Sequence, residues 1–246
     1  MKKSKILEQK KKSWRAIYLI GGFAGFLAAL VFRLFLAVEL MTFNGFGIFQ
    51  MPLKEPMGAL EWFTLLENNK AVALILLGLV DMINFLLVGL LFTAIYIALR
   101  KADKLVMNFA IILTVVSISL FISSNQMVGI AQLSDKYHAA ASTAQSSIYL
   151  ASAEALVANI QGMGWYASLF LIYLDGFMIS MVMRRNDVFN KATAWAGIFA
   201  NSFGLLLFPM LLLAPSLAWI PPSFSAPFRL TWYILIALRL FKLSKK

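Results

Sequence analysis

Charged and amide side chains occur inside stretches of the chain that are otherwise apolar, and these side chains could do chemistry. A charged group at the centre of a membrane helix costs about 3 kcal/mol on insertion scales, so such a residue is a functional-site hypothesis whose partner must be found. Carboxyl and guanidinium groups can exchange protons, pair with one another or bind a small ligand. The residues of this kind are Arg33, Asp81, Asn84, Asp175 and Asn201.

Two interpretations of these residues stay open. In the structural one, each acid pairs with an arginine, accepts hydrogen bonds or loses its charge, and the network fixes the register of the helices. In the functional one, Arg33, Asp81 and Asp175 line an outward-opening polar cavity that binds a ligand or carries protons, with Asn84 and Asn201 beside them. Further polar residues would form the outer rim of that cavity, namely Glu39, Asn125, Gln126, Glu154 and Arg229.

The two aspartates by themselves do not indicate catalysis. Paired aspartates can share a proton, as in aspartyl proteases, but the contexts Leu79-Val80-Asp81-Met82 and Tyr173-Leu174-Asp175-Gly176 are not specific for such an enzyme. The chain has no cysteine and one histidine, His138, so a thiolate zinc site, an iron–sulfur cluster or a bis-histidine haem site cannot be assembled from it. We expect no metal and no cofactor, and we favour a protein that is not an enzyme.

The composition requires a membrane around these residues. Of the 246 residues, 61% are hydrophobic and 13% are charged, and the mean hydropathy is +0.80. A globular domain has about 25% charged residues, and its interior could not hold such an apolar excess, so part of the surface must face lipid. The 21 Phe, 7 Tyr and 6 Trp also exclude a disordered chain.

Six segments are long enough to cross a membrane. About 20 mostly apolar residues are needed, because each helical residue rises about 1.5 Å and the hydrocarbon core is about 30 Å thick. The sequence therefore predicts an all-α polytopic transmembrane helix bundle that forms one membrane domain over residues 1–246, with a basic tail at residues 1–13. The predicted spans are residues 14–40, 71–99, 105–125, 162–183, 192–214 and 224–243.

The net charge of +11 is distributed unevenly across these spans. Of the 22 basic residues, 17 fall on one side: seven before residue 16, three in residues 100–104, three in residues 184–191 and four after residue 238. Cytoplasmic loops carry such an excess, so both termini are predicted to be cytoplasmic, in the cytoplasmic (inner) membrane. The charge thus indicates orientation and not nucleic-acid binding. The basic tail is expected to touch anionic headgroups, at about 1 kcal/mol per basic residue.

Two of the outer connections have a distinct composition. Residues 137–157 are rich in alanine and contain no Gly or Pro, which predicts one extra outer-side helix at about residues 136–160. A re-entrant segment is the alternative for residues 134–161, although Glu154 disfavours it because a carboxylate is costly at membrane depth. Residues 215–227 hold four of the seven prolines and are expected to form an extended cover.

Several segments resemble a known family. They are Leu79-Val80-Asp81-Met82-Ile83-Asn84 with the helix end Tyr96-Ile97-Ala98-Leu99-Arg100, the stretch Ala153-Glu154-Ala155-Leu156, and Gly176 followed by a basic turn. Over roughly residues 70–215 the chain is similar to an uncharacterised bacterial family of six-helix integral membrane proteins, catalogued as a domain of unknown function. The resemblance implies the same topology and supplies no activity and no catalytic residues.

The sequence therefore favours a non-enzymatic, accessory or small-ligand-handling membrane protein with an outward-facing polar pocket. A proton-coupled permease that uses Asp81 or Asp175 is the alternative. A membrane hydrolase or transferase acting on lipid, through Glu39 and Glu154, is the third hypothesis. Membrane lipids are the expected partners, together with a partner membrane protein or a second copy of the chain in a homo-oligomer.

Overall fold

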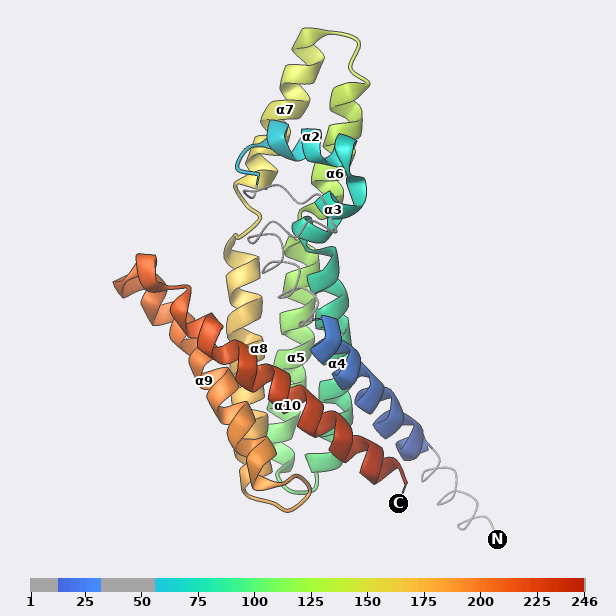
Figure 1. Ribbon diagram of the computed structural model, residues 1–246, viewed down its shortest axis with the longest axis vertical. Helices are drawn as coiled ribbons and strands as arrows, with labels where there is room; N and C mark the ends of the chain where they lie inside the picture. The colour runs from blue at the N-terminus through green and yellow to red at the C-terminus, as the bar shows by residue number, and fades with distance from the viewer. Residues whose placement is uncertain (1–12, 32–55, 246) are drawn as a thin grey trace, which may run out of the picture. The chain divides into compact units, whose positions relative to one another are not determined.

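The computed structural model describes residues 13–31 and 56–245 (Figure 1). In this part of the chain the regular elements are helices. Arg33, Glu39 and residues 1–12 of the predicted basic tail lie outside the described residues.

Six helical stretches are long and apolar enough to cross a membrane, which confirms the all-α polytopic architecture. The third is longer than its predicted span, because a second apolar helix follows the first almost directly and extends the stretch to residue 138. The six stretches are Ser13–Val31, Lys70–Leu99, Lys104–His138, Met163–Arg184, Lys191–Leu213 and Pro215–Ser244.

The described residues divide into two compact units. Unit 1 comprises residues 13–31, 84–118 and 168–245, and unit 2 comprises residues 56–83 and 119–167. Each unit has its own buried apolar core, and each is described by itself below.

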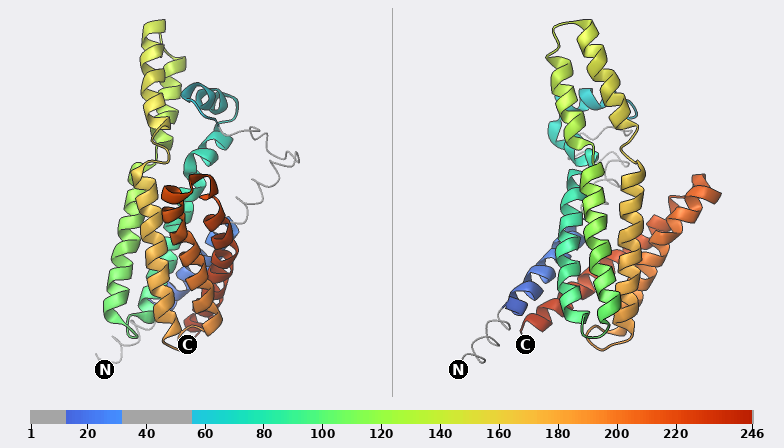
Figure 2. Two further views of the ribbon diagram at one scale, coloured as in Figure 1. Left: turned by 90° about the vertical axis from the view of Figure 1, so that its left-hand side faces the viewer. Right: turned by 180° about the vertical axis from the view of Figure 1, so that it is seen from behind.

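Unit 1 contains the N-terminal helix, most of α4, α5 and α8, and all of α9 and α10. Helices α9 and α10 lie side by side (Figure 2). The core of the unit includes the edge-to-face pair Phe92 and Trp232, whose ring centroids are 5.7 Å apart. The N-terminal helix approaches α4 closely, since a Cβ on Gly25 would lie 2.9 Å from Leu91 Cδ1. The bounds are α4 Val80–Leu99, α5 Lys104–Ser124, α8 Met163–Arg184, α9 Lys191–Leu213 and α10 Ile220–Ser244.

Unit 2 contains α2, α3, the π-helix η1, α6 and α7, with the adjoining ends of α4, α5 and α8. Helices α6 and α7 lie side by side, and α2 packs against both (Figure 2). The core of this unit includes Trp62 and Phe63 of α2 and Ile130 of α6, which are almost fully buried. The bounds are α2 Ala59–Asn68, α3 Lys70–Leu74, η1 Ile75–Leu79, α6 Met127–His138 and α7 Thr143–Val157.

The predicted outer helix at residues 136–160 corresponds to the last turn of α6 and to α7. Between them, Ser142 adopts an extended conformation and its side chain accepts a 3.3 Å hydrogen bond from the Gln145 backbone N–H. A serine at this position satisfies one of the free donors of a helix N-terminus. The helix therefore begins at Thr143, after a short turn that the alanine-rich composition does not reveal.

The predicted extended cover at residues 215–227 is wrong. Pro215–Leu217 forms a 3-10 turn and α10 begins at Ile220, so most of the proline-rich stretch is helical. Pro221 and Pro222 lie in the first turn of α10, where backbone N–H groups have no partner within the helix and a proline costs little. Pro227 lies further along, in the interior of α10, so the proline content of this stretch does not mark where the helix begins.

Candidate functional site

A carboxyl group lies fully buried in unit 1. Asp175 is the thirteenth residue of α8, and its exposed fraction is 0%. Its Oδ2 accepts a hydrogen bond from the Thr114 hydroxyl of α5, which also lies 3.1 Å from the carbonyl oxygen of Ala110. A hydroxyl has one proton, so Thr114 donates to one of these acceptors at a time. When it donates to Ala110, its lone pairs are free to accept a hydrogen bond from a protonated Asp175.

The second carboxyl oxygen of Asp175 has no partner within the described part of the chain. Oδ1 is buried and makes no hydrogen bond, and no described Lys, Arg or His forms an ion pair with the carboxyl group. Burying an unpaired ionised carboxylate is very costly. Binding one proton would remove this charge.

Asn201 of α9 lies against α8 at Gly176, the residue that follows Asp175 in the chain. A Cβ on Gly176 would lie 2.6 Å from Asn201 Cγ, so a glycine is needed to leave room for the amide. Asn201 is buried, and its Nδ2 donates a 2.7 Å hydrogen bond to the Gly197 carbonyl oxygen in the preceding turn. The structure therefore places Asn201 next to the residue that follows Asp175 in the chain.

Small residues let α8, α9 and α10 approach closely at this level. A Cβ on Gly197 would collide with Ser180 Oγ and would lie 2.6 Å from Trp232 Cε2. Ser180 itself donates a 2.7 Å hydrogen bond to the Gly176 carbonyl oxygen. Such close packing leaves no space for bulk solvent between these groups.

Arg229 of α10 belongs to the same unit but is held by other partners. Its Cζ lies 4.3 Å from the centroid of the Tyr173 ring, and its Nη2 donates a 3.0 Å hydrogen bond to Ser225 Oγ. A cation above an aromatic face is stabilised without a carboxylate. Arg229, a predicted rim residue, therefore faces an aromatic ring and a hydroxyl and forms no ion pair with Asp175.

Asp81 and Asn84 are assigned to different units, although three residues separate them in α4. Asp81, in unit 2, is half-buried and makes no hydrogen bond or ion pair with another described residue. Asn84, in unit 1, has a buried Oδ1 that lacks a described hydrogen-bond partner. Arg33 lies outside the described residues, so the cavity of Arg33, Asp81 and Asp175 stays a prediction.

Glu154, another predicted rim residue, caps a helix. Its Oε1 accepts a 2.9 Å hydrogen bond from the backbone N–H of Ala59, the first residue of α2. The residue before it, Gly58, has no side chain that could cap the helix. A carboxylate at a helix N-terminus satisfies a free donor and interacts favourably with the helix dipole. The contacts of Glu154 are therefore structural.

Asn125 and Gln126 form the junction between α5 and α6. Asn125 Nδ2 donates a 3.2 Å hydrogen bond to the Leu77 carbonyl oxygen in η1, and Oδ1 accepts a 2.9 Å hydrogen bond from the Met127 N–H. The adjacent Gly78 has φ = 101°, and a Cβ there would lie 2.8 Å from Asn125 Nδ2. A positive φ and this close approach both require glycine. The Asn125 amide thus joins the helix junction to the kink in η1.

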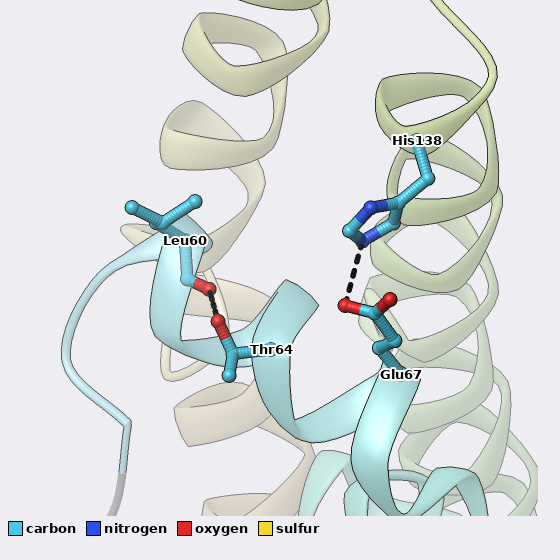
Figure 3. A network of polar contacts seen from close by, with 4 residues as sticks. All are labelled: Leu60, Thr64, Glu67 and His138. Atoms are coloured by element: carbon cyan, nitrogen blue, oxygen red, sulfur yellow. Dashed lines mark hydrogen bonds and ion pairs between the residues drawn. The ribbon is translucent and has the colours of Figure 1, made fainter.

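One exposed polar contact joins α2 to α6 in unit 2, and a second lies within α2 (Figure 3). His138 Nε2 lies 3.9 Å from Glu67 Oε2, and their side chains are 40% and 64% exposed. Thr64 Oγ1 donates a 2.8 Å hydrogen bond to the Leu60 carbonyl oxygen in α2. His138 is thus a surface residue with one acidic neighbour, and no group of three or more His, Asp or Glu residues that could hold a metal occurs in the described ranges.

No protein-family model, curated protein or solved structure matches this chain. Its function must therefore be inferred from the residues themselves. Among the described polar residues, Asp175 stands apart because it has an ionisable side chain, is fully buried and is hydrogen-bonded through only one of its two carboxyl oxygens.

Thr114 is the partner that the sequence reasoning missed. A threonine in an apolar span is common and carries no charge, so it does not attract notice. The signal that could have found it is helical spacing, because Ala110, Thr114, Ser117 and Phe121 repeat at four, three and four residues and are all buried. A hydroxyl on that face had to contact a neighbouring helix.

Proposed function

We propose that this membrane protein binds and releases a proton at Asp175 and acts as a proton-coupled permease for a small solute. The observation that carries the proposal is the buried carboxyl group with one oxygen bonded to Thr114 and the other without a partner. Ionisable groups inside membrane helices mark proton relays and substrate pathways. The proposal keeps the interpretation of a non-enzymatic protein, with the proton as the ligand at this site.

The contacts of Thr114 support the proposal, because they suit both states of the carboxyl group. An ionised Asp175 accepts the hydroxyl proton of Thr114. A protonated Asp175 donates to Thr114 Oγ1, while the Thr114 hydroxyl turns to the Ala110 carbonyl oxygen. One rotation of the Thr114 hydroxyl therefore keeps the hydrogen bond between Thr114 and Asp175 in both states of the carboxyl group.

The surroundings of Asp175 provide the second support. A carboxyl group that only fixed helix register would be expected to satisfy both of its oxygens, because buried polar groups are normally hydrogen-bonded. By contrast, Glu154 bonds to a backbone N–H, which favours a structural role over the lipid hydrolase or transferase hypothesis for that residue.

The experiment uses proteoliposomes that contain a pH-sensitive dye. Defined mixtures of amino acids, sugars, organic acids and small amines are added outside, and the internal pH is followed. One mixture should drive proton movement in the wild type and in Asp135→Asn, the control at an exposed site. The Asp175→Asn variant should show no such movement, although it elutes like the wild type on size-exclusion chromatography. Proton flux that persists in folded Asp175→Asn, or no flux with any mixture, contradicts the permease.

The proposed location is the cytoplasmic membrane with both termini inside, supported by the 17 basic residues on one side of the spans. The chain has no cysteine, so single cysteines report accessibility cleanly. In intact cells, a membrane-impermeant thiol reagent should label Lys136→Cys and spare Lys101→Cys and Arg185→Cys. The opposite pattern would reverse the orientation. Membership in the six-helix bacterial family is likewise a proposal.

A further inference from the structure

A cavity of about 460 Å³ lies in unit 1 where the turn between α8 and α9 meets the last turns of α10. Three basic residues, Lys191, Arg239 and Lys242, contribute to its lining, against one acidic residue, Asp187. The rest of the lining consists of the apolar side chains of Phe189, Leu235 and Leu238 and the polar side chains of Asn190 and Thr193. The cavity thus combines a surplus of positive charge with an apolar side.

The positive charges in this lining are oriented by the backbone and not neutralised by acids. Lys191 Nζ donates a 2.7 Å hydrogen bond to the Arg184 carbonyl oxygen, and Arg239 Nε donates to the carbonyl oxygen of Val188. No described carboxylate lies within 4.0 Å of the Lys191, Arg239 or Lys242 nitrogen atoms. Lys191 and Arg239 are therefore held in place by the backbone, and no described carboxylate pairs with them or with Lys242.

The cavity lies at the boundary of the apolar spans. Lys191 is the first residue of one candidate span, and Lys242 lies two residues before the end of another. Trp195, 43% exposed, lies one turn into α9, and the Arg184 guanidinium lies 5.5 Å from its ring centroid. Tryptophan and arginine side chains of this kind are typical of the headgroup region. Leu238 is 45% exposed, and it offers an apolar surface where an acyl chain would begin.

We propose that this cavity binds the phosphate headgroup of one anionic glycerophospholipid, with Arg239, Lys242 and Lys191 around the phosphate and Leu238 beside the acyl chain. Basic pockets between membrane helices at the cytoplasmic side suit such headgroups. The free N–H groups at the start of α9 add positive potential to a site that the side chains already define. The lining of this site shares no residue with the contacts of Asp175, and the site does not depend on proton binding.

The test is native mass spectrometry of the full-length protein after delipidation, titrated with phosphatidylglycerol or with phosphatidylcholine. The wild type should retain one phosphatidylglycerol in preference to phosphatidylcholine. Arg239→Gln/Lys242→Gln should weaken this binding about thirtyfold, and Lys242→Gln alone about fivefold. The matched control, Lys101→Gln/Lys104→Gln, removes two exposed charges from another basic turn and should change binding less than about threefold.

Three results would overturn the proposal. The first is that the wild type, folded Lys242→Gln and the folded double variant bind phosphatidylglycerol with equal affinity. The second is that the wild type binds phosphatidylcholine as tightly as phosphatidylglycerol. The third is that stoichiometric glycerol 3-phosphate displaces the lipid. The last result would assign the cavity to a soluble phosphate compound. Because Arg239 also bonds to the backbone, circular dichroism must show an unchanged helix content in the double variant. If it does not, the exposed Lys242→Gln substitution decides alone.

Discussion

In unit 1 the carboxyl group of Asp175 is fully buried and has one unpartnered oxygen, whereas in unit 2 the carboxyl groups of Glu154 and Glu67 meet a helix N-terminus and an exposed histidine. All three residues are acids near or within apolar helices, but their surroundings favour different roles. A satisfied carboxylate at a helix end stabilises local structure. A half-satisfied carboxyl group in a closely packed interior is suited to exchanging a proton.

The largest difference between the units should come from glycine packing. Gly197→Ala places a Cβ against Ser180 Oγ and the Trp232 ring, and it should destabilise the protein by about 3 kcal/mol because a closely packed core cannot absorb the overlap. Gly58→Ala in unit 2 meets only an ordinary contact with Glu154 at 3.4 Å and should cost less than about 1 kcal/mol. Thermal unfolding in detergent measures both, and equal melting temperatures would remove the proposed contrast in packing.

The hydrogen bond between Thr114 and Asp175 should give the next largest effect. Thr114→Val is close to isosteric and removes the hydroxyl, which leaves both carboxyl oxygens buried without a partner, so we expect a loss of about 2 kcal/mol. Thr114→Ser keeps the hydroxyl and should lose less. The same unfolding experiment distinguishes them, and a Thr114→Val variant as stable as wild type would mean that the hydroxyl does not satisfy Asp175.

The smallest effects should come from the acids of unit 2. Glu154→Ala removes the cap of α2 and should cost about 1 kcal/mol, whereas Glu154→Gln retains an acceptor and should cost less. Glu67→Gln, which touches only an exposed histidine, is the matched control and should change stability by at most a few tenths of a kcal/mol. Chemical denaturation is sensitive enough to measure the cost of Glu154→Ala. A cost for Glu67→Gln as large as that for Glu154→Ala would argue against the capping role.

The architecture could be predicted from the sequence because bilayer thickness fixes the length of an apolar helix. Charge at the segment ends then separates one span from the next. The effect of the prolines was harder to predict, because α10 contains Pro221 and Pro222 in its first turn, where a proline costs little, and also Pro227 in its interior. The kink at Gly78 could not be predicted either, because the amino-acid composition does not show which glycine adopts a positive φ.

The candidate site could be predicted only in part. Asp175 and Asn201 stood out because polar groups are rare in apolar spans. The hydrogen-bond partners could not be deduced, because they come from other helices, as Thr114 does for Asp175 and Glu154 does for the start of α2. Which residues share one site depends on the placement of helices, and spacing along a single helix does not contain that information.

Infrared difference spectroscopy measures directly whether Asp175 binds a proton in the folded protein. Spectra are recorded in lipid nanodiscs over the pH range in which the protein stays folded, for the wild type, Asp175→Asn and Asp135→Asn. We predict a carbonyl-stretch band of a protonated carboxylic acid that changes with pH in the wild type and in Asp135→Asn, and that is absent in folded Asp175→Asn. If the band does not depend on Asp175, or does not respond to pH, the carboxyl group is a packing element and the proposal of proton binding at Asp175 is wrong.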